Sequence, residues 1–565
     1  MARLIAVVLI TAAVQIAAGN PSPGDELLPL GRFRMADPDY YIPAKDWEPV
    51  AHLPEAWGGW QEGWSFFKRL DLSNPISVER PNEPIEVEVE FHATQVSDLA
   101  REVRVAAVET EKGPIREVPS QVYGDVAEDG ARRCRLFFIA DLKPETTTTY
   151  LIFYGNPAAP EPGYETDLQV SGEEYALDVE NRYYRIELAK SMGQLKNIAF
   201  KEGSAFLDKG AGMPYRGHGV EGTIHHNPDW SDEYTGRYRV TSWEKPPHYE
   251  VIRGPVCVRT RRWGHPILSQ GPNFGRSHKV VATITYTFYA SLPYVVMESH
   301  LDVMEDVRFS DCRNDEWVGI AKEMPEMAWR FGKGEIGFGL KGWSKQDPSW
   351  LTVFNKETGD GFATIRMDYE CTHPDWHQPA SVALSNSSGG LWVRYPLRNA
   401  IMRTGDLVRE KNAYLLHRYE ASSENGFGML LDYAERLAHP PVQEPVPSQP
   451  RPLTRENVVD ALRACYDTEL YIRGRPTNKR VLSYVDLGWV RDVEIAGDAV
   501  HISLVLPYPG RENSFGYFVE NMEQQIRERI EGVGKVEVEL VREPVWQQEQ
   551  MTHKARRILD LDAKD

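Results

Sequence analysis

Cysteine is scarce in this chain, and its spacing excludes several kinds of site. The 565 residues include five cysteines, and no two of them lie close enough to form a CxxC-type metal or redox motif. They are Cys134, Cys257, Cys312, Cys371 and Cys465. A sparse and odd-numbered set is also untypical of a disulfide-rich secreted scaffold, although one or two bridges stay open.

Positive charge is in deficit. The chain has 64 Lys and Arg residues against 83 Asp and Glu residues, a formal net charge of −19. Because nucleic acids and anionic membrane surfaces attract local excesses of Lys and Arg, this composition argues against both as partners. Hydrophobic residues make up 41% of the chain and charged residues 26%, which excludes a mainly disordered protein.

Long apolar runs are absent after the first 18 residues. Arg3 precedes an apolar stretch over residues 4–18, which is followed by Gly19 and a Pro-rich segment. This order is typical of a secretory signal peptide over residues 1–19, and the stretch is shorter than the ~20 residues that cross a bilayer. We therefore expect an exported protein, whether periplasmic, cell-surface or extracellular, with no transmembrane segment after cleavage. A retained membrane anchor is the alternative.

A series of amphipathic helices is missing between residues 25 and 439, which excludes a (β/α) barrel and a helical toroid. Strand patterns take their place. Apolar and acidic residues alternate over residues 85–91, and β-branched and aromatic residues dominate residues 280–289. We predict a multidomain, mainly β chain, with a β-sandwich over residues 25–155 and a larger β-domain over residues 163–440.

A proline-rich linker over residues 441–452 precedes a change of structural class. Thr454 has the position of an N-cap for a first helix, and residues 515–530 have the pattern of a second helix. A hairpin pattern lies between them, and a strand pattern follows over residues 536–541. We predict a small α+β domain over residues 453–565.

Ordered motifs in this last domain resemble a known family. Residues 485–490 (VDLGWV), 506–510 (LPYPG) and 544–546 (PVW) are similar to those of the MIP18-like family of iron–sulfur assembly factors. The resemblance implies that family's fold, and it implies a cysteine in the loop after the second hairpin strand that would hold iron or cluster components. Residues 509–514 contain no cysteine.

Cys465 is the single cysteine of this domain, and it falls in or at the end of the first predicted helix. At such a place a cysteine is more often a small buried hydrophobic residue than a ligand of a metal or cluster. A lone thiol is also a poor cluster site, because these clusters usually need several cysteine ligands. We therefore expect an accessory domain that keeps the family's fold without its cluster chemistry. Whether residues 453–565 bind a protein partner stays open.

A second resemblance covers the β region. Motifs at residues 118–122 and 179–186 resemble the β-domain that follows the catalytic barrel in family 38 α-mannosidases. Over residues 115–440 the chain is similar, more broadly, to the galactose-mutarotase-like supersandwich of carbohydrate-active enzymes. The resemblance implies a supersandwich over residues 163–440 and a polysaccharide or oligosaccharide partner. It transfers no catalytic residue, because the metal and nucleophile of those mannosidases belong to another domain.

Two segments combine aromatic rings suited to stacking on sugars with groups that bind hydroxyls or move protons. The predicted substrate-binding residues are His225, Trp230, Glu233, His373, Asp375 and Trp376. The predicted catalytic residues are His226, Tyr234, Asp232, His377 and Arg394.

Two kinds of chemistry fit these residues. In a polysaccharide lyase, Tyr234 or a histidine would remove the proton α to a uronate carboxyl while Arg394 or Arg398 neutralises that carboxylate. In a glycoside hydrolase, Asp232 and Asp375 would form a carboxylate pair. Pro374 argues against a helix that would align two histidines, so we assign no metal ligand, and the sequence identifies no cofactor.

Two further function classes stay open. One is a metal or iron–sulfur cluster assembly factor in which the β region is a scaffold. The missing loop cysteine and the predicted signal peptide argue against it. The other is a noncatalytic envelope scaffold or interaction protein, which the lack of a helical catalytic domain keeps level with the carbohydrate hypothesis.

Overall fold

The computed structural model describes residues 40–444 and 452–556 apart from short gaps. The gaps are residues 45, 58–61, 109–114, 129–130, 208–223, 226–228, 233–235, 241–242, 269–277, 318–322, 340–341, 384–391, 423–424, 467–470, 473–474, 477–481, 508–514 and 553–554. The chain divides into two compact units, residues 1–444 and residues 445–565.

The larger unit begins with a β-sandwich. The strand order of its first sheet is β1 (Tyr40–Ile42), β4 (Arg80–His92), β8 (Ala131–Leu142), β7 (Ser120–Glu128). The order of its second sheet is β2 (Glu48–Pro49), β3 (Phe66–Ser73), β9 (Thr147–Tyr154), β5 (Arg104–Val108), β6 (Ile115–Val118), and β32 (Val442–Glu444) pairs with β3. Strand β4 buries Val87 and Val89 against residues such as Ile152 of β9, while its glutamates point to the other face. The sandwich predicted from this alternation is confirmed.

Three further sheets follow in the same unit. The first is β10 (Gln169–Glu173), β11 (Ala176–Glu180), β12 (Tyr184–Leu188), β13 (Leu195–Phe200), β14 (Phe206–Leu207). The second sheet is here named the opposing sheet. Its strand order is β20 (Ile267–Leu268), β17 (Gly236–Arg239), β16 (Asp229–Asp232), β23 (Val307–Trp317), β30 (Trp392–Met402), β29 (Ala380–Ala383), β26 (Trp343–Ser344). Strand β15 (Ile224–His225) also pairs with β23. The third sheet is here named the long sheet. Its strand order is β18 (His248–Arg253), β19 (Cys257–Gly264), β21 (Val280–Tyr289), β22 (Tyr294–Val303), β31 (Leu407–Arg418), β28 (Asp360–Cys371), β27 (Trp350–Phe354), β24 (Glu326–Arg330), β25 (Ile336–Phe338).

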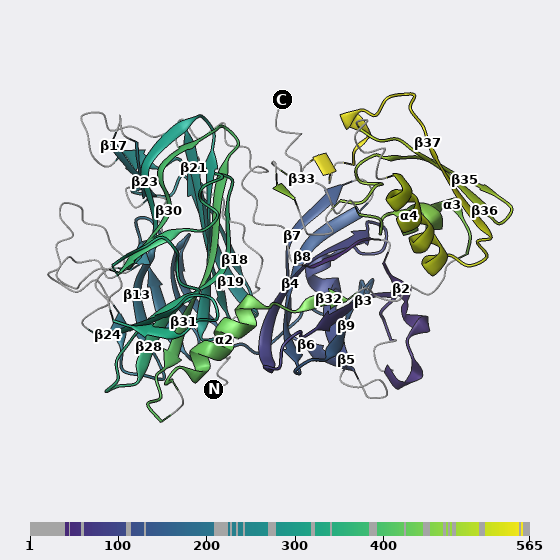
Figure 1. Ribbon diagram of the computed structural model, residues 1–565. Helices are drawn as coiled ribbons and strands as arrows, with labels where there is room; N and C mark the ends of the chain where they lie inside the picture. The colour runs from purple at the N-terminus through teal and green to yellow at the C-terminus, as the bar shows by residue number, and fades with distance from the viewer. Residues whose placement is uncertain are drawn as a thin grey trace, which may run out of the picture. The chain divides into compact units, whose positions relative to one another are not determined.

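The long sheet is covered on both faces. Its strands β21 and β31 are drawn in the teal and green part of Figure 1. One face packs on the opposing sheet and on β11 to β13, with Tyr286, Tyr414, Trp317 and Trp392 in the shared core. The other face packs on residues of the first sandwich and on helix α2 (Gly428–Ala438). This double cover explains why all ten residues of β21 are buried.

Two α-helices occur among the described residues between 40 and 439, where the sequence showed no helical series. Helix α1 (Leu99–Glu102) is a single turn, which Asp98 caps by accepting from the backbone N–H of Arg101. Helix α2 buries Leu430 and Leu437 against the long sheet. The mainly β class predicted for this region is confirmed.

The smaller unit is an α+β domain. Its sheet has the order β35 (Val490–Ala496), β36 (Ala499–Leu504), β37 (Lys535–Leu540), and a two-stranded piece pairs β33 (Tyr471–Ile472) with β34 (Arg475–Pro476). Helices α3 (Arg455–Leu462) and α4 (Phe515–Arg529) supply Leu462 and Phe518 to one core with the sheet. Thr454 caps α3 as predicted, accepting from the backbone N–H of Asn457 at 3.2 Å. Most of the helix predicted after Thr552 lies outside the described residues.

All five cysteines are buried and none is in a disulfide. No helix in the described ranges combines the length and the hydropathy that a membrane crossing requires.

Candidate functional site

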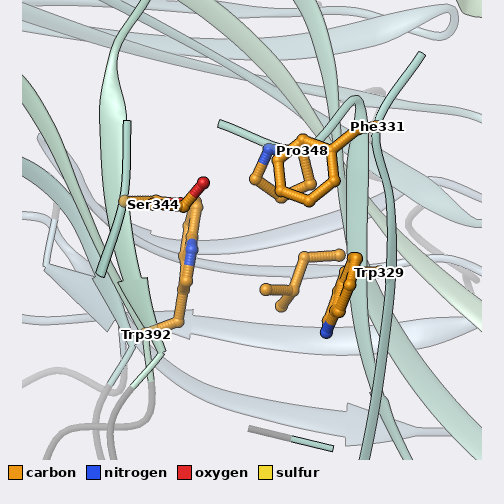
Figure 2. A pocket seen from close by; sticks show the side chains of 7 residues that line it. Trp329, Phe331, Ser344, Pro348 and Trp392 are labelled. Carbon is orange, nitrogen blue, oxygen red and sulfur yellow. The ribbon is translucent and has the colours of Figure 1, made fainter. Parts of the chain in front are cut away.

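A cavity lies between the long sheet and the opposing sheet. Its lining is mainly aromatic and apolar, with two serines. The lining residues are Trp329, Phe331, Ser344, Pro348, Leu351, Ser381 and Trp392. Figure 2 shows Trp392 and Ser344 on one side of the space, Trp329 and Phe331 on the other, and Pro348 at its upper end. The empty space is about 230 Å³ and includes some open solvent.

Strand register explains how these side chains meet. In the opposing sheet, Ser344 of β26 pairs with Ser381 of β29, which pairs with Arg394 of β30. Trp392 lies two residues before Arg394 on β30 and therefore shares its face. In the long sheet, Trp329 of β24 pairs with Leu351 of β27. One transverse row of residues from each sheet thus builds most of the cavity.

A buried ionic cluster lies next to this wall. The guanidinium of Arg394 is 2.8 Å from Oδ2 of Asp347, 3.1 Å from Oδ2 of Asp315 and 3.7 Å from Oε1 of Glu410. The four side chains are at most 2% exposed. We name these four residues the acidic cluster. Asp315 comes from β23, Asp347 from the turn before β27 and Glu410 from β31, so the cluster joins both sheets.

Neighbouring groups hold the carboxylates in place. The Tyr414 hydroxyl donates to Oδ1 of Asp315 at 2.7 Å, and the Trp317 indole N–H donates to the same oxygen at 3.1 Å. Arg366 contributes a second guanidinium, whose Nη1 donates to the backbone carbonyl of Asp347 at 3.3 Å. These contacts fix the positions of the acids without a water-exposed partner.

Burial sets the ionisation of the acidic cluster. Desolvation raises the pKa of Asp315 to about 6 and the pKa of Glu410 to about 7, while the nearby positive charge of Arg394 opposes both shifts. Desolvation likewise raises the pKa of Asp347 against the opposing effect of Arg394. The Arg394 pKa, which burial alone would lower, is raised overall by the three carboxylates around it. Burial thus shifts the ionisation of this coupled set of carboxyl groups toward neutral pH.

Three residues of the cavity wall connect it with the acidic cluster. The Ser381 side chain hydrogen-bonds to Asp347, and Pro348 follows Asp347 in the chain. The Arg394 guanidinium carbon lies 4.8 Å from the centre of the Trp392 ring system. Trp392 is fully buried, and its indole nitrogen has no hydrogen-bond partner among the described residues. The site therefore offers aromatic faces and an unused donor beside groups that can exchange protons.

Six of the eleven predicted site residues lie where no side chain is described. His226, Glu233 and Tyr234 are outside the described residues. His225, Trp230 and Asp232 have a described backbone in β15 and β16, which pair with β23. The sequence predicted a loop at this place, and the short strands correct that prediction. The roles proposed for these residues stay predictions.

The second predicted segment is a turn between β28 and β29, as expected. His373 is half-buried, and its Nδ1 accepts from the backbone N–H of Asp375 at 3.2 Å. Trp376 is half-buried and packs on the apolar core between the two sheets, while its carbonyl accepts from Tyr369 at 3.2 Å. Asp375 and His377 are exposed. The polar contacts of this turn are thus mainly local.

Arg394 has a different setting from the one that the lyase hypothesis assumed. Its charge is already matched by Asp315, Asp347 and Glu410, which the sequence did not single out. Two of its hydrogen bonds reach residues that lie 47 and 79 positions away in the sequence. No local sequence pattern therefore reveals the acidic cluster. Asp315 has a φ of 59°, which is uncommon for a residue other than glycine but leaves no mark in the sequence.

The smaller unit contains no second candidate site among its described residues. Cys465 is fully buried in the core, and its Sγ lies 3.8 Å from the backbone carbonyl of Asn521. Within the described ranges of the whole chain, no group of three or more His, Cys, Asp or Glu side chains is placed to hold a metal ion. The thiol does not fit a role as cluster ligand in this arrangement.

Comparison with known families supports the resemblance of this unit. Residues 455–540 match the family model described as iron–sulfur cluster assembly protein. A search of curated proteins finds no match to the chain. The MIP18-like resemblance predicted from the sequence motifs is confirmed.

Solved structures similar to the chain are of the two kinds that the sequence resemblance named. An α-mannosidase from Enterococcus faecalis V583 matches at 10% identity with a TM-score of 0.39, covering 70% of this chain and 47% of that one. A glycosyl hydrolase family 38 protein from Enterococcus faecalis matches at 10% identity with a TM-score of 0.40, covering 67% and 47%. A galactose 1-epimerase from Lactobacillus acidophilus NCFM matches at 8% identity with a TM-score of 0.27, covering 45% and 99%. The chain spans about half the length of the two Enterococcus structures.

Proposed function

We propose that this chain is an exported protein that binds carbohydrate in the cavity between the long sheet and the opposing sheet, with the C-terminal domain as an accessory module. The observation that carries the proposal is the cavity walled by Trp329, Phe331 and Trp392 beside the acidic cluster. Sugar rings pack their apolar faces on aromatic side chains, and their hydroxyls bond to a few fixed polar groups.

The size of the cavity indicates how much of a sugar chain it takes. The 230 Å³ includes open solvent, and the closed space of about 10 Å³ has room for one water molecule, far below the ~300–1,000 Å³ of common ligand pockets. We infer that one ring at the end of a sugar chain enters only when the half-buried side chains of Trp329 and Phe331 move apart. The exchangeable protons of the acidic cluster would serve a hydrolase or a lyase as acid and base if the scissile bond reaches it.

Binding and cleavage are tested together with a panel of neutral and uronic-acid oligosaccharides. Calorimetry measures binding, and new reducing ends or unsaturated products report cleavage. We expect at least one sugar to bind the wild type, and Trp329→Ala to weaken that binding about tenfold through loss of stacking. Trp57→Ala, at a half-buried tryptophan of the first sandwich, serves as the control and should leave binding unchanged.

The outcomes separate the function classes. Binding with cleavage supports an enzyme, and binding without cleavage supports a noncatalytic binding or scaffold protein. Failure of every sugar to bind, or full retention of binding by Trp329→Ala, would contradict the proposal.

The export part of the proposal rests on the apolar segment over residues 4–18, which lies outside the described residues. The mature protein, purified from an exporting host, should begin near residue 20 when its N-terminus is sequenced. An N-terminus at Met1 in the exported fraction would contradict it.

A second candidate function, iron–sulfur cluster assembly, is favoured by the family match over residues 455–540. The burial of Cys465 argues against cluster binding by this unit. We expect the full chain, incubated anaerobically with ferrous iron and sulfide and then desalted, to keep much less than one equivalent of iron and of acid-labile sulfide. Stoichiometric retention that Cys465→Ser abolishes would favour the assembly function instead.

A further inference from the structure

We propose that the outer face of the opposing sheet binds a uronate unit of an acidic polysaccharide, which packs on Trp343 while the guanidinium of Arg398 pairs with its carboxylate. This surface is separate from the cavity between the sheets. Binding there adds a second contact with a sugar chain to the proposed function and does not depend on the cavity.

Strand alternation places this surface on the side of the opposing sheet away from the cavity. Ser344 of β26 lines the cavity, and Trp343 precedes it, so the two side chains leave opposite faces of the sheet. Trp343 pairs with Val382 of β29, which pairs with Val393 of β30. Tyr395 lies two residues after Val393 and therefore shares the face of Trp343. The Trp343 and Tyr395 rings meet there with their centroids 5.4 Å apart.

Trp343 is open to solvent, unlike other tryptophans of this sheet. It is 45% exposed, whereas Trp317 and Trp392 are fully buried. Arg398 of β30 is also exposed, and its guanidinium carbon lies 4.8 Å from the centre of the Trp343 ring system. Stacking on the ring fixes the plane of the guanidinium and leaves the N–H donors in that plane open to a ligand. A ligand therefore reaches both groups without any rearrangement of the fold.

Arg398 differs from Arg394 in its charge environment. Arg394 is surrounded by three carboxylates, whereas Arg398 makes no ion pair and no hydrogen bond with a described residue. The register partner of Arg398 on β23 is Asp311, whose carboxylate lies 3.4 Å from the guanidinium of Arg237. Of the two arginines that the lyase hypothesis considered, Arg398 is therefore the one with donors available for a carboxylate of a ligand.

The charge of this surface complements an anion. Arg313 pairs with Glu316 at 3.4 Å, next to the Arg237 pair. Burial raises the pKa of Tyr395, and the charges of both ion pairs act on the same pKa, so they lie around its hydroxyl. Together with Arg398, three guanidinium groups face two carboxylates, an excess of one positive charge. This local excess contrasts with the formal net charge of −19 of the whole chain.

A uronate sugar satisfies both parts of the surface. Its ring packs an apolar face against the indole, and its carboxylate accepts parallel N–H bonds from the guanidinium. A neutral sugar meets the ring but leaves the charge of Arg398 without a counter-ion. A nucleic acid needs several cations along its phosphates, which an excess of one positive charge does not supply.

The experiment compares matched hexasaccharides on the full chain by calorimetry at pH 7 and low salt. The uronate hexamers are those of galacturonate, mannuronate and guluronate, each with its carboxyl-reduced neutral counterpart. Hexaglutamate serves as an anionic chain without sugar rings.

We expect at least one uronate hexamer to bind at least tenfold more tightly than its neutral counterpart, and Arg398→Met to bring this ratio close to one. Arg403→Met is the control and should keep the ratio, because Arg403 follows β30 and is already paired with Asp306 at 2.6 Å.

Trp343→Ala should weaken uronate binding about tenfold through loss of stacking. Phe206→Ala, at a ring of β14 that is 47% exposed, is its control and should leave binding unchanged. Arg398 and Trp343 are both exposed, so neither substitution disturbs the core.

Trp329→Ala separates this surface from the cavity. The preference for uronate should persist in Trp329→Ala, because Trp329 belongs to the long sheet. Loss of the preference in Trp329→Ala together with its retention in Arg398→Met overturns the inference and assigns the preference to the cavity.

The remaining outcomes are also decisive. Binding of neutral hexamers alone overturns the inference and leaves the proposed function intact. Hexaglutamate that binds as tightly as the best uronate overturns it in favour of an acidic peptide as the partner. Failure of every sugar to bind overturns the inference together with the proposed function.

Discussion

Single residues of the acidic cluster make the stability of the larger unit depend on pH. The folded state raises the pKa of Glu410 to about 7, above its value in an unfolded chain, because burial disfavours the ionised form. The folded state thus holds this proton more firmly, and stability falls as pH rises from about 5 to about 8. The raised pKa of Asp315, at about 6, acts in the same direction.

Replacement of Glu410 by glutamine should flatten this dependence. We expect the wild type to lose on the order of 3 kcal/mol between pH 5 and pH 8 through Glu410, and Glu410→Gln to lose less. Urea unfolding at several pH values measures the difference. Glu357→Gln, in an exposed turn, is the matched control and should follow the wild type. Parallel pH profiles for wild type and Glu410→Gln would rule out the assignment.

The sequence identified only part of this cluster. Arg394 was predicted only as a group that would neutralise the carboxylate of a uronate substrate. Its acids come from three other segments, and a φ of 59° at Asp315 helps to place one of them. Such a cluster depends on which strands become neighbours, and strand order is not encoded in local patterns.

At the scale of elements, the turn between β12 and β13 depends on a glycine. Gly193 has a φ of +66°, and a Cβ there would lie 2.8 Å from Cδ of Arg262 and 3.0 Å from Cδ2 of Tyr175. We expect Gly193→Ala to destabilise the larger unit by about 1–3 kcal/mol, as measured by urea unfolding. Gly405→Ala is the control, since Gly405 has a φ of +89° but no atom within 4 Å of its Cβ position. Equal losses in the two variants would show that contact with Arg262 has no effect.

An ion pair between Arg259 and Glu86 joins β19 of the long sheet to β4 of the first sandwich. Arg259 donates to both carboxylate oxygens of Glu86, at 2.8 and 3.0 Å, and to the Tyr123 hydroxyl at 2.6 Å. Burial alone would raise the pKa of Glu86, but Arg259 lowers it to about 2. A depressed carboxyl pKa stabilises the fold above about pH 4, and this contribution is lost as pH falls toward 2.

Removal of the guanidinium leaves Glu86 buried without its partner. Arg259→Met should therefore cost about 3–5 kcal/mol at pH 7 and less at pH 3, where Glu86 can take a proton. Unfolding in urea at the two pH values measures this. Arg185→Met breaks an exposed pair with Asp178 and should change stability little. A loss in Arg259→Met that is the same at both pH values would point to packing rather than charge.

Strand prediction succeeded where the pattern of side chains was long. Residues 280–289 form a strand with the predicted bounds, since their β-branched and aromatic residues suit a sheet covered on both faces. The pieces β15 and β16 were missed because strands of two and four residues are too short to give a periodic signal. Helix α2 was missed as a lone helix in a β region.

At the scale of the whole molecule, the two compact units imply a cleavable connection between them. The sequence of residues 445–452 is rich in proline and begins at the boundary between the two units. We expect limited proteolysis of the native chain to cut within or close to residues 441–452 and to leave two stable fragments, which mass spectrometry identifies. First cuts inside residues 163–440 or 453–565, with no cut near the linker, would contradict the predicted domain boundaries.

The sequence predicted the class of the whole molecule better than its site. Alternation indicated the β region, and ordered motifs indicated the C-terminal fold, because both signals are local. The cavity needs Trp329 and Trp392 from different sheets, and those sheets meet only after the long-range pairing of β23 with β30 and β22 with β31. The predicted site residues of the 225–234 segment await a test of their own.

The most direct test of the central claim is a crystal structure of the full chain soaked with a neutral monosaccharide that binds in solution. We predict density for one sugar ring between Trp329 and Trp392, with the Trp329 side chain displaced from its position in the sugar-free protein. Density for the sugar at another place, with the cavity between these two tryptophans lacking it, would contradict the account.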